Sequence, residues 1–167
     1  MKITYLHHSG FSVETETKVL LFDYYTEGGR KAYFDPAAYP DKAVFVFVSH
    51  AHEDHYDRRI LSWAKLPNVR YVLSFDVRTE AGFEGRVLRA EPHRTYDFDG
   101  ISIQTLRSND EGVAFLVKAD GKTIYHAGDL NWWHWNGEPD DFNADIEKSY
   151  TTEINRLKGE KIDVAFV

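Results

Sequence analysis

The sequence contains no cysteine among its 167 residues. Disulfide bonds and thiolate zinc sites are therefore excluded, so any metal ion has to be held by imidazoles and carboxylates. The chain also lacks an uninterrupted apolar run of the roughly 18 residues that a membrane span requires, and its first residues show no signal-peptide pattern. These absences predict a cytoplasmic protein that does not insert into a membrane.

Basic residues are too few for a nucleic-acid surface. The chain has 20 lysines and arginines against 27 aspartates and glutamates, a net charge of −7. Because phosphate backbones are bound by clustered basic side chains, we expect a small-molecule substrate and no nucleic-acid partner. The length and a hydrophobic content of 43% predict one domain over residues 1–167 and leave the oligomeric state undetermined.

Short strands separated by turns dominate the apolar pattern. The segments that predict strands are residues 3–6, 11–15, 19–22, 43–48, 69–73, 86–88, 101–106, 113–117 and 122–126. Asp120-Gly121 predicts a tight hairpin, and helices are expected over 58–65, capped by Asp57, and over 140–157. Helices alternating with strands and frequent hairpins predict an α/β (α+β) fold with mixed sheets.

The last six residues, 162–167, form a buried-strand pattern that no turn or polar tail follows. A domain rarely ends in this way. We therefore expect a truncated domain whose C-terminal part is missing.

The most informative segment is residues 49–55, SHAHEDH, which follows a buried strand. In open α/β sheets ligands usually bind where such strands end. His50 and His52 alternate and can point toward one metal ion, whereas Asp54 and His55 turn toward a second. The alternative is a histidine-rich surface loop or satisfied core histidines, but no structural need calls for three imidazoles and a carboxylate at a strand end.

A second segment, residues 125–129 with the sequence YHAGD, also ends an apolar strand. Gly128 permits a close approach of another backbone, and Asp129 would stand at the rim with an oxygen free to bridge two cations. Gly-Asp alone is most often a turn. Its combination with the histidine-rich segment predicts a metal site.

On these residues the chain resembles the metallo-β-lactamase superfamily, and within it the ascorbate-6-phosphate lactonase-like branch. The matching segments, in order along the chain, are 6–11, 21–23, 49–55 and 125–129. The resemblance implies a four-layer αβ/βα sandwich with mixed sheets and two metal ions at one edge.

The same resemblance implies roles for individual residues. It implies that His50 and His52 bind the first metal ion, that Asp54 and His55 bind the second, and that Asp129 bridges both. It also implies that Asp23 lies close behind the ligand histidines and that His8 lies at the pocket rim; the alternative for each is a cap or a solvated residue. The expected cofactor is a divalent metal, zinc first, with manganese or iron as alternatives.

The chain departs from the family pattern at two places. The loop 106–112, which usually supplies a third histidine to the first metal, contains none here. Asp110 or Glu111 can substitute as an oxygen ligand, although a solvated acidic turn is the simpler reading, and His93 is expected to be a loop residue. A last histidine ligand of the second metal would follow a strand like 162–167, and no residue of the sequence fills that role.

A tryptophan-rich stretch, 130–137, follows Asp129 directly. Indole rings most often pack in cores, but the position next to an expected ligand favours a pocket wall that includes Trp132.

The expected activity is that of a metal-dependent hydrolase. A water between two metals loses its proton near neutral pH and attacks an ester, lactone, amide or phosphoester of a small metabolite. Asp54 is expected to orient this water and accept its proton, and His126 or His8 to protonate the leaving group. Two alternatives remain open: a metal- or ligand-binding member that has lost hydrolysis, and a nuclease-type phosphodiesterase, which should carry a basic groove.

Overall fold

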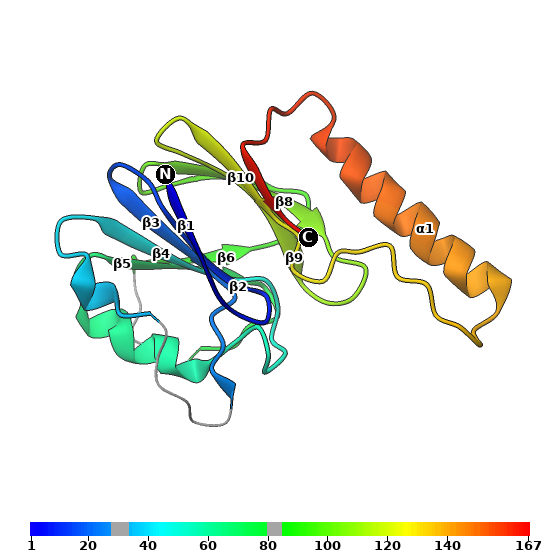
Figure 1. Ribbon diagram of the computed structural model, residues 1–167, viewed down its shortest axis with the longest axis horizontal. Helices are drawn as coiled ribbons and strands as arrows, with labels where there is room; N and C mark the ends of the chain where they lie inside the picture. The colour runs from blue at the N-terminus through cyan, green and yellow to red at the C-terminus, as the bar shows by residue number, and fades with distance from the viewer. Residues whose placement is uncertain (28–33, 80–84) are drawn as a thin grey trace.

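The computed structural model describes residues 1–27, 34–79 and 85–167, whose strands form two sheets that pack face to face (Figure 1). The first sheet has the order β1-β2-β3-β4-β5-β6. Its strands are β1 (Lys2–His7), β2 (Gly10–Glu14), β3 (Lys18–Phe22), β4 (Ala43–Val48), β5 (Val69–Ser74) and β6 (Val87–Ala90). The first three strands pair antiparallel and the rest parallel, so the sheet is mixed, as the sequence predicts.

The second sheet has the order β11-β10-β9-β8-β7. Its strands are β7 (Thr95–Phe98), β8 (Ile101–Arg107), β9 (Val113–Ala119), β10 (Lys122–His126) and β11 (Val164–Phe166). The predicted hairpin joins β9 to β10: Asp120 and Gly121 have φ angles of 47° and 69°, the pair of left-handed residues that a type I′ turn needs.

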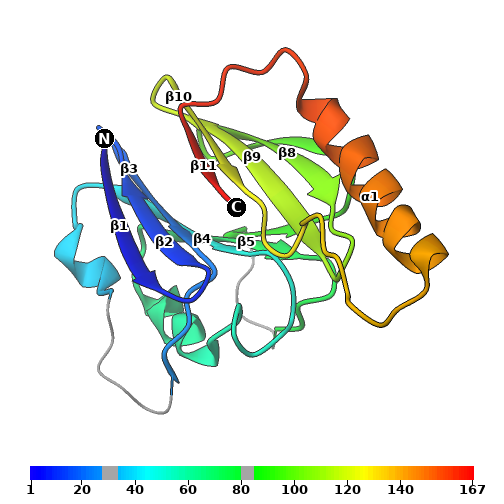
Figure 2. The same ribbon diagram turned by 45° about the vertical axis from the view of Figure 1, so that its right-hand side comes forward.

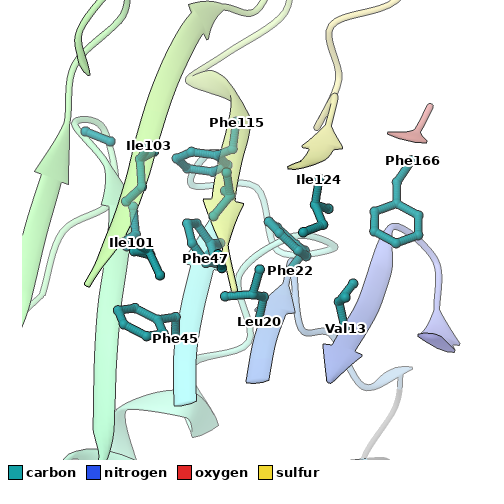
Figure 3. Packing of buried hydrophobic residues seen from close by; sticks show 14 of the residues in the cluster. Val13, Leu20, Phe22, Phe45, Phe47, Ile101, Ile103, Phe115, Ile124 and Phe166 are labelled. Atoms are coloured by element: carbon teal, nitrogen blue, oxygen red, sulfur yellow. The ribbon is translucent and has the colours of Figure 1, made fainter. Parts of the chain in front are cut away.

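Aromatic and branched side chains fill the space between the sheets (Figure 3). Phe22 and Phe47 of the first sheet stack at a centroid distance of 4.8 Å, and Phe47 meets Phe115 of the second sheet edge-on at 5.2 Å. The central strands β3, β4 and β5 of the first sheet are buried on both faces over most of their length, which explains why the 43–48 segment is apolar throughout.

Helical segments cover the two outer faces. The 3₁₀ helix η3 (Arg58–Lys65) packs on the first sheet, and α1 (Asp140–Ile154) packs on the second; η2 (Pro36–Ala38) and η4 (Asn155–Leu157) are short. Figure 2 shows η3 and α1 on opposite outer sides of the paired sheets. The predicted αβ/βα four-layer sandwich is confirmed. No helix in the described ranges is long and apolar enough to cross a membrane.

Four elements differ from the sequence-based prediction. Strand β7 was not predicted, because its four residues are partly exposed and carry no apolar run. The 58–65 helix is 3₁₀ instead of α, although Asp57 caps it as expected by accepting a hydrogen bond from the backbone N–H of Arg59. The last helix continues past Ile154 as η4, and β11 covers only residues 164–166 of the predicted 162–167.

His93 is a loop residue, as expected, and it ties α1 to the second sheet. Its Nε2 lies 2.9 Å from the buried carboxylate of Glu153 near the end of the helix, and Glu153 also accepts a hydrogen bond from the backbone N–H of Arg107. His93 therefore takes no part in the histidine cluster described next.

Candidate metal centre

The candidate site lies where β4 and β10 end. Ser49 follows β4, Gly128 follows β10, and the β8–β9 turn ends at Gly112 against both. A Cβ atom on Gly112 would lie 2.0 Å from the Ser49 carbonyl oxygen, and one on Gly128 would lie 2.7 Å from the Ser49 Cβ. Glycine at both positions therefore lets three loops converge on the start of the histidine-rich segment, the close approach that the sequence predicts for Gly128.

Asp23 lies beneath this segment as a buried anion. Its Oδ1 accepts a hydrogen bond from the Ser49 backbone N–H, and its Oδ2 accepts from the Ser49 hydroxyl, His55 Nδ1 and His126 Nε2. Burial acts to raise the pKa of this carboxyl, but the interactions with His126 and His55 outweigh burial and hold the pKa well below its usual range. Asp23 therefore stays ionised and accepts hydrogen bonds from Ser49, His55 and His126.

These hydrogen bonds determine which imidazole nitrogens face the site. Because the Ser49 hydroxyl donates to Asp23, its oxygen accepts from His50 Nδ1, 2.9 Å away, and the lone pair of His50 is left on Nε2. His55 Nδ1 likewise donates to Asp23, so Nε2 is its free nitrogen. Oriented in this way, both rings present Nε2 for coordination.

The first donor group consists of two imidazoles and two carboxylates. His50 Nε2 lies 2.9 Å from His52 Nδ1 and 3.6 Å from Asp129 Oδ2, and His52 Nδ1 lies 3.5 Å from Asp110 Oδ2. One donor atom from each of the four residues lies within 4.8 Å of the others. The structure therefore brings Asp110, from the loop that lacks a histidine, next to His50 and His52.

The second donor group lies on the other side of Asp129. His55 Nε2 is 3.3 Å from Asp129 Oδ1 and 3.7 Å from Asp54 Oδ2, and Asp54 Oδ2 is 2.8 Å from His8 Nε2. Asp129 thus turns one oxygen toward His50 and the other toward His55. This is the arrangement that a bridging carboxylate needs.

The donor types fit divalent metal ions. Donors that share one ion at about 2.0–2.2 Å in tetrahedral geometry lie roughly 3.3–3.6 Å apart, and the separations around Asp129 are 3.3 and 3.6 Å. Imidazole and carboxylate together suit zinc and are also accepted by manganese and iron.

Proton affinity differs between the imidazoles of His50 and His55. Burial and the neighbouring His55 lower the pKa of His50, which keeps its ring neutral. Burial also lowers the pKa of His55, but the hydrogen bonds to Asp129 and Asp23 outweigh it and raise the pKa to about 10. Hydrogen bonding to His55 in turn lowers the pKa of Asp129. A metal ion bound at His55 would therefore displace a proton.

Two residues lie elsewhere than their expected roles require. His126 is buried behind His55, with Asp23 between the two rings, so it is placed to position Asp23 and not to protonate a leaving group. Trp132 is 51% exposed, and its ring lies against Tyr150 of α1, at a centroid distance of 6.2 Å. The neighbouring Trp133 is the indole that reaches the site, because its Nε1 donates to the Asp129 carbonyl.

Ser49 and Asp76 are functional candidates that the sequence did not single out. Ser49 orients His50 as described, and Asp76 accepts a hydrogen bond from the backbone N–H of Ala51 and so holds the histidine-rich segment in place. Asp76 follows β5, the parallel neighbour of β4. Asp76 could have been found from the sequence, because it is an acidic residue just past a strand that runs parallel to β4.

Two open cavities border the first donor group. One of about 290 Å³ is lined by Phe75, Asp76, Arg107 and the β8–β9 turn. The other, of about 420 Å³, lies between this turn and α1. Both include Asp110, so a molecule in either cavity lies beside a candidate metal ligand.

Comparison with known proteins assigns the family. Residues 2–144 match the family described as the beta-lactamase superfamily domain. A metal-dependent hydrolase of the UPF0173 group from Pyrococcus abyssi is 30% identical over 142 residues, which cover 77% of this chain and 61% of that protein. The chain therefore belongs to the metallo-β-lactamase superfamily, as the motifs predict, and spans about three fifths of the length of this relative. The lactonase-like branch stays a prediction.

Solved structures agree with the fold. A HARLDQ-motif mutant of a metallo-beta-lactamase from Cronobacter sakazakii superposes with a TM-score of 0.58 at 14% identity, covering 94% of this chain and 70% of that one. CmlA, a diiron β-hydroxylase from Streptomyces venezuelae, gives a TM-score of 0.55 at 16% identity and covers 96% of this chain and 33% of its own. At these identities the likeness establishes the fold alone.

Proposed function

We propose that this protein is a metal-dependent hydrolase that binds two divalent ions and cleaves an ester, lactone, amide or phosphoester of a small metabolite. The observation that carries the proposal is the placement of Asp129, whose two carboxylate oxygens face two separate imidazoles, His50 at 3.6 Å and His55 at 3.3 Å. The relatives named as metal-dependent hydrolases support it.

His50, His52, Asp110 and Asp129 would hold the first ion, and Asp54, His55 and Asp129 the second. When bound, such ions polarise the substrate's oxygen and lower the pKa of water to near neutrality. Zinc is the first candidate, and manganese and iron suit the same donors.

The chain's own residues supply orientation. Asp23 and Ser49 fix the tautomers of His50 and His55, so both ligand rings are held before a substrate arrives. Asp54 is half exposed and faces His55 with one oxygen, which leaves its other oxygen free to orient a water and accept its proton. No serine or cysteine nucleophile is required.

Cavity size supports a small substrate. The two cavities beside Asp110 measure about 290 and 420 Å³, near the lower end of the range for small-molecule sites. Arg107 borders both cavities among the acidic groups Asp76, Asp110 and Glu111, so the region carries no basic groove of the kind that a polynucleotide needs.

Metal removal and reloading tests the proposal. The protein is stripped with a chelator, reloaded with zinc, manganese or iron, and assayed against chromogenic esters, lactones and phosphodiesters. We expect hydrolysis to return with at least one metal and Asp129→Asn to reduce it by about 100-fold or more, because both ions lose a ligand.

Asp97→Asn is the matched control, since Asp97 lies on the exposed face of β7. Hydrolysis that survives chelation would contradict the proposal. Protein that binds metal but cleaves no substrate in the panel would favour a binding member of the superfamily instead.

A further inference from the structure

We infer that His8 is a ligand of the second metal ion, supplied by the first hairpin of the chain. The inference rests on the proposed function and deepens it: His8 joins Asp54 and His55 as the third side chain of a donor group that Asp129 completes. In this role His8 binds the metal ion directly, instead of only bordering the pocket.

The β1–β2 turn is built to hold His8 at the site. His8 has a left-handed φ of 52°, and Gly10 follows two residues later at the start of β2. A Cβ atom on Gly10 would lie 2.8 Å from the His7 carbonyl oxygen and 3.1 Å from that of Asp23. The turn therefore packs against the residue that orients His55, which fixes the hairpin relative to the second donor group.

The distances place His8 within coordination range of its neighbours. His8 Nε2 lies 2.8 Å from Asp54 Oδ2, and the His8 ring meets the His55 ring edge-on at a centroid distance of 5.7 Å. One donor atom from each of His8, Asp54 and His55 lies within 4.8 Å of the others. A single ion can therefore reach all three donors.

A simple ion pair between His8 and Asp54 explains the geometry less well. The two side chains are 48% and 45% exposed, and exposed ion pairs of this kind contribute little to the stability of a fold. An ion pair with His8 alone does not account for the same Asp54 oxygen also facing His55 Nε2, at 3.7 Å, whereas a shared metal ion does.

With His8 included, the two donor groups match. Each contains two imidazoles, one carboxylate of its own and one oxygen of Asp129: His50, His52 and Asp110 on one side, and His8, His55 and Asp54 on the other. Equal donor sets predict two ions held with comparable affinity.

Cobalt binding tests the role of His8 without an activity assay. Wild-type protein and the variants His8→Ala, His8→Gln and His7→Ala are titrated with Co²⁺ by calorimetry and visible absorption. We expect two ions per wild-type chain. For His8→Ala the second ion should bind at least 100-fold more weakly, beyond the loss of about 10–100-fold that a residue behind the ligands causes.

His8→Gln separates ligation from hydrogen bonding. Its amide can still donate to Asp54 but cannot replace an imidazole, so a ligand role predicts the same loss as for His8→Ala. His7→Ala is the matched control from the same hairpin, because His7 stacks on Tyr25 and belongs to neither donor group. It should bind two ions with unchanged affinity.

Three outcomes would overturn the inference: two ions retained by His8→Ala, affinity restored by His8→Gln, or no cobalt bound by wild type. Both ions retained with hydrolysis lost would make His8 a general acid. If wild-type protein binds two ions but cleaves no substrate, the proposed hydrolase is refuted. The ligand role of His8 is then still tested by the number of ions that the His8 variants bind.

Discussion

At the scale of single residues, Asp110 and Glu111 are neighbouring carboxylates that reach different sides of one imidazole. Asp110 Oδ2 lies 3.5 Å from His52 Nδ1, the nitrogen that faces His50, whereas Glu111 Oε2 lies 3.6 Å from His52 Nε2. Of these two carboxylates, only that of Asp110 therefore belongs to the first donor group.

We expect Asp110→Asn to weaken binding of the first metal ion by about 10–100-fold or more, because an amide is a poorer ligand than a carboxylate. Glu111→Gln should leave metal affinity within a few-fold of wild type. Equilibrium dialysis with elemental analysis measures both. Equal effects of the two substitutions would show that the loop contributes only its negative charge.

Gly112 and Gly121 provide a matched pair of glycines for testing the convergence of the loops. Both have a φ of +69°, but a Cβ would clash with Ser49 and His50 at Gly112 and meets nothing within 4 Å at Gly121. Gly121→Ala should cost about 1–2 kcal/mol of unfolding free energy from the left-handed backbone alone.

Gly112→Ala should cost a further 1–3 kcal/mol or so from the clash, and it should also weaken metal binding. Urea denaturation gives both unfolding free energies. Similar values for the two variants would mean that the β8–β9 turn moves away from Ser49 without penalty.

At the scale of elements, Asp120 joins the β9–β10 hairpin of one sheet to the β2–β3 hairpin of the other. Its carboxylate accepts hydrogen bonds from the Thr15 hydroxyl, the Thr17 backbone N–H and the Lys18 ammonium. Burial acts to raise the pKa of Asp120, but the interactions with Lys18, Thr17 and Thr15 outweigh it and hold the pKa well below its usual range.

Asp120→Asn keeps a residue that tolerates the left-handed turn and removes the charge. We expect a loss of about 1.5–3 kcal/mol of unfolding free energy at neutral pH. Because the folded pKa is depressed, the stabilisation is complete above the unfolded pKa of about 3.9 and is lost as the pH falls toward the folded value. Urea denaturation of both proteins should therefore give curves that converge below about pH 4; a constant difference would contradict the ion pair.

At the scale of the whole molecule, the metal ions would connect loops from both sheets. His50, His52, Asp54 and His55 follow β4 of the first sheet, whereas Asp110 and Asp129 belong to loops of the second. Ions bound to the folded chain should therefore stabilise it as a unit.

A metal concentration of about 100 times the dissociation constant should add roughly 2.7 kcal/mol per ion, and a chelator should reverse the effect. For a chain of this length that corresponds to a rise in Tm of about 5–10 °C. Thermal denaturation followed by circular dichroism, with and without chelator, measures it. An unchanged Tm at saturating metal would show that the donor groups do not bind the ions in the folded state.

Sequence-based prediction was most successful where apolar periodicity was long or residue types were unusual. The buried strand β4, the Asp120-Gly121 hairpin and the family followed from such patterns. It missed β7, which is short and half exposed, and it gave His126 the role of protonating a leaving group, which its buried position behind Asp23 does not allow. The sequence does not distinguish a histidine at a strand end that faces solvent from one that faces the core.

The sequence by itself determined the donor types, because a chain without cysteine offers only imidazole and carboxylate, and its apolar pattern placed the segments 49–55 and 125–129 at the ends of strands. Only the tertiary structure decided which side chains share a position: Asp110 beside His52, His8 beside Asp54, and Asp23 behind His55. These contacts join residues 58, 46 and 32 positions apart, respectively. The first contact depends on how the two sheets pack and the other two on how distant strands of the first sheet come together, and local patterns carry no information about either.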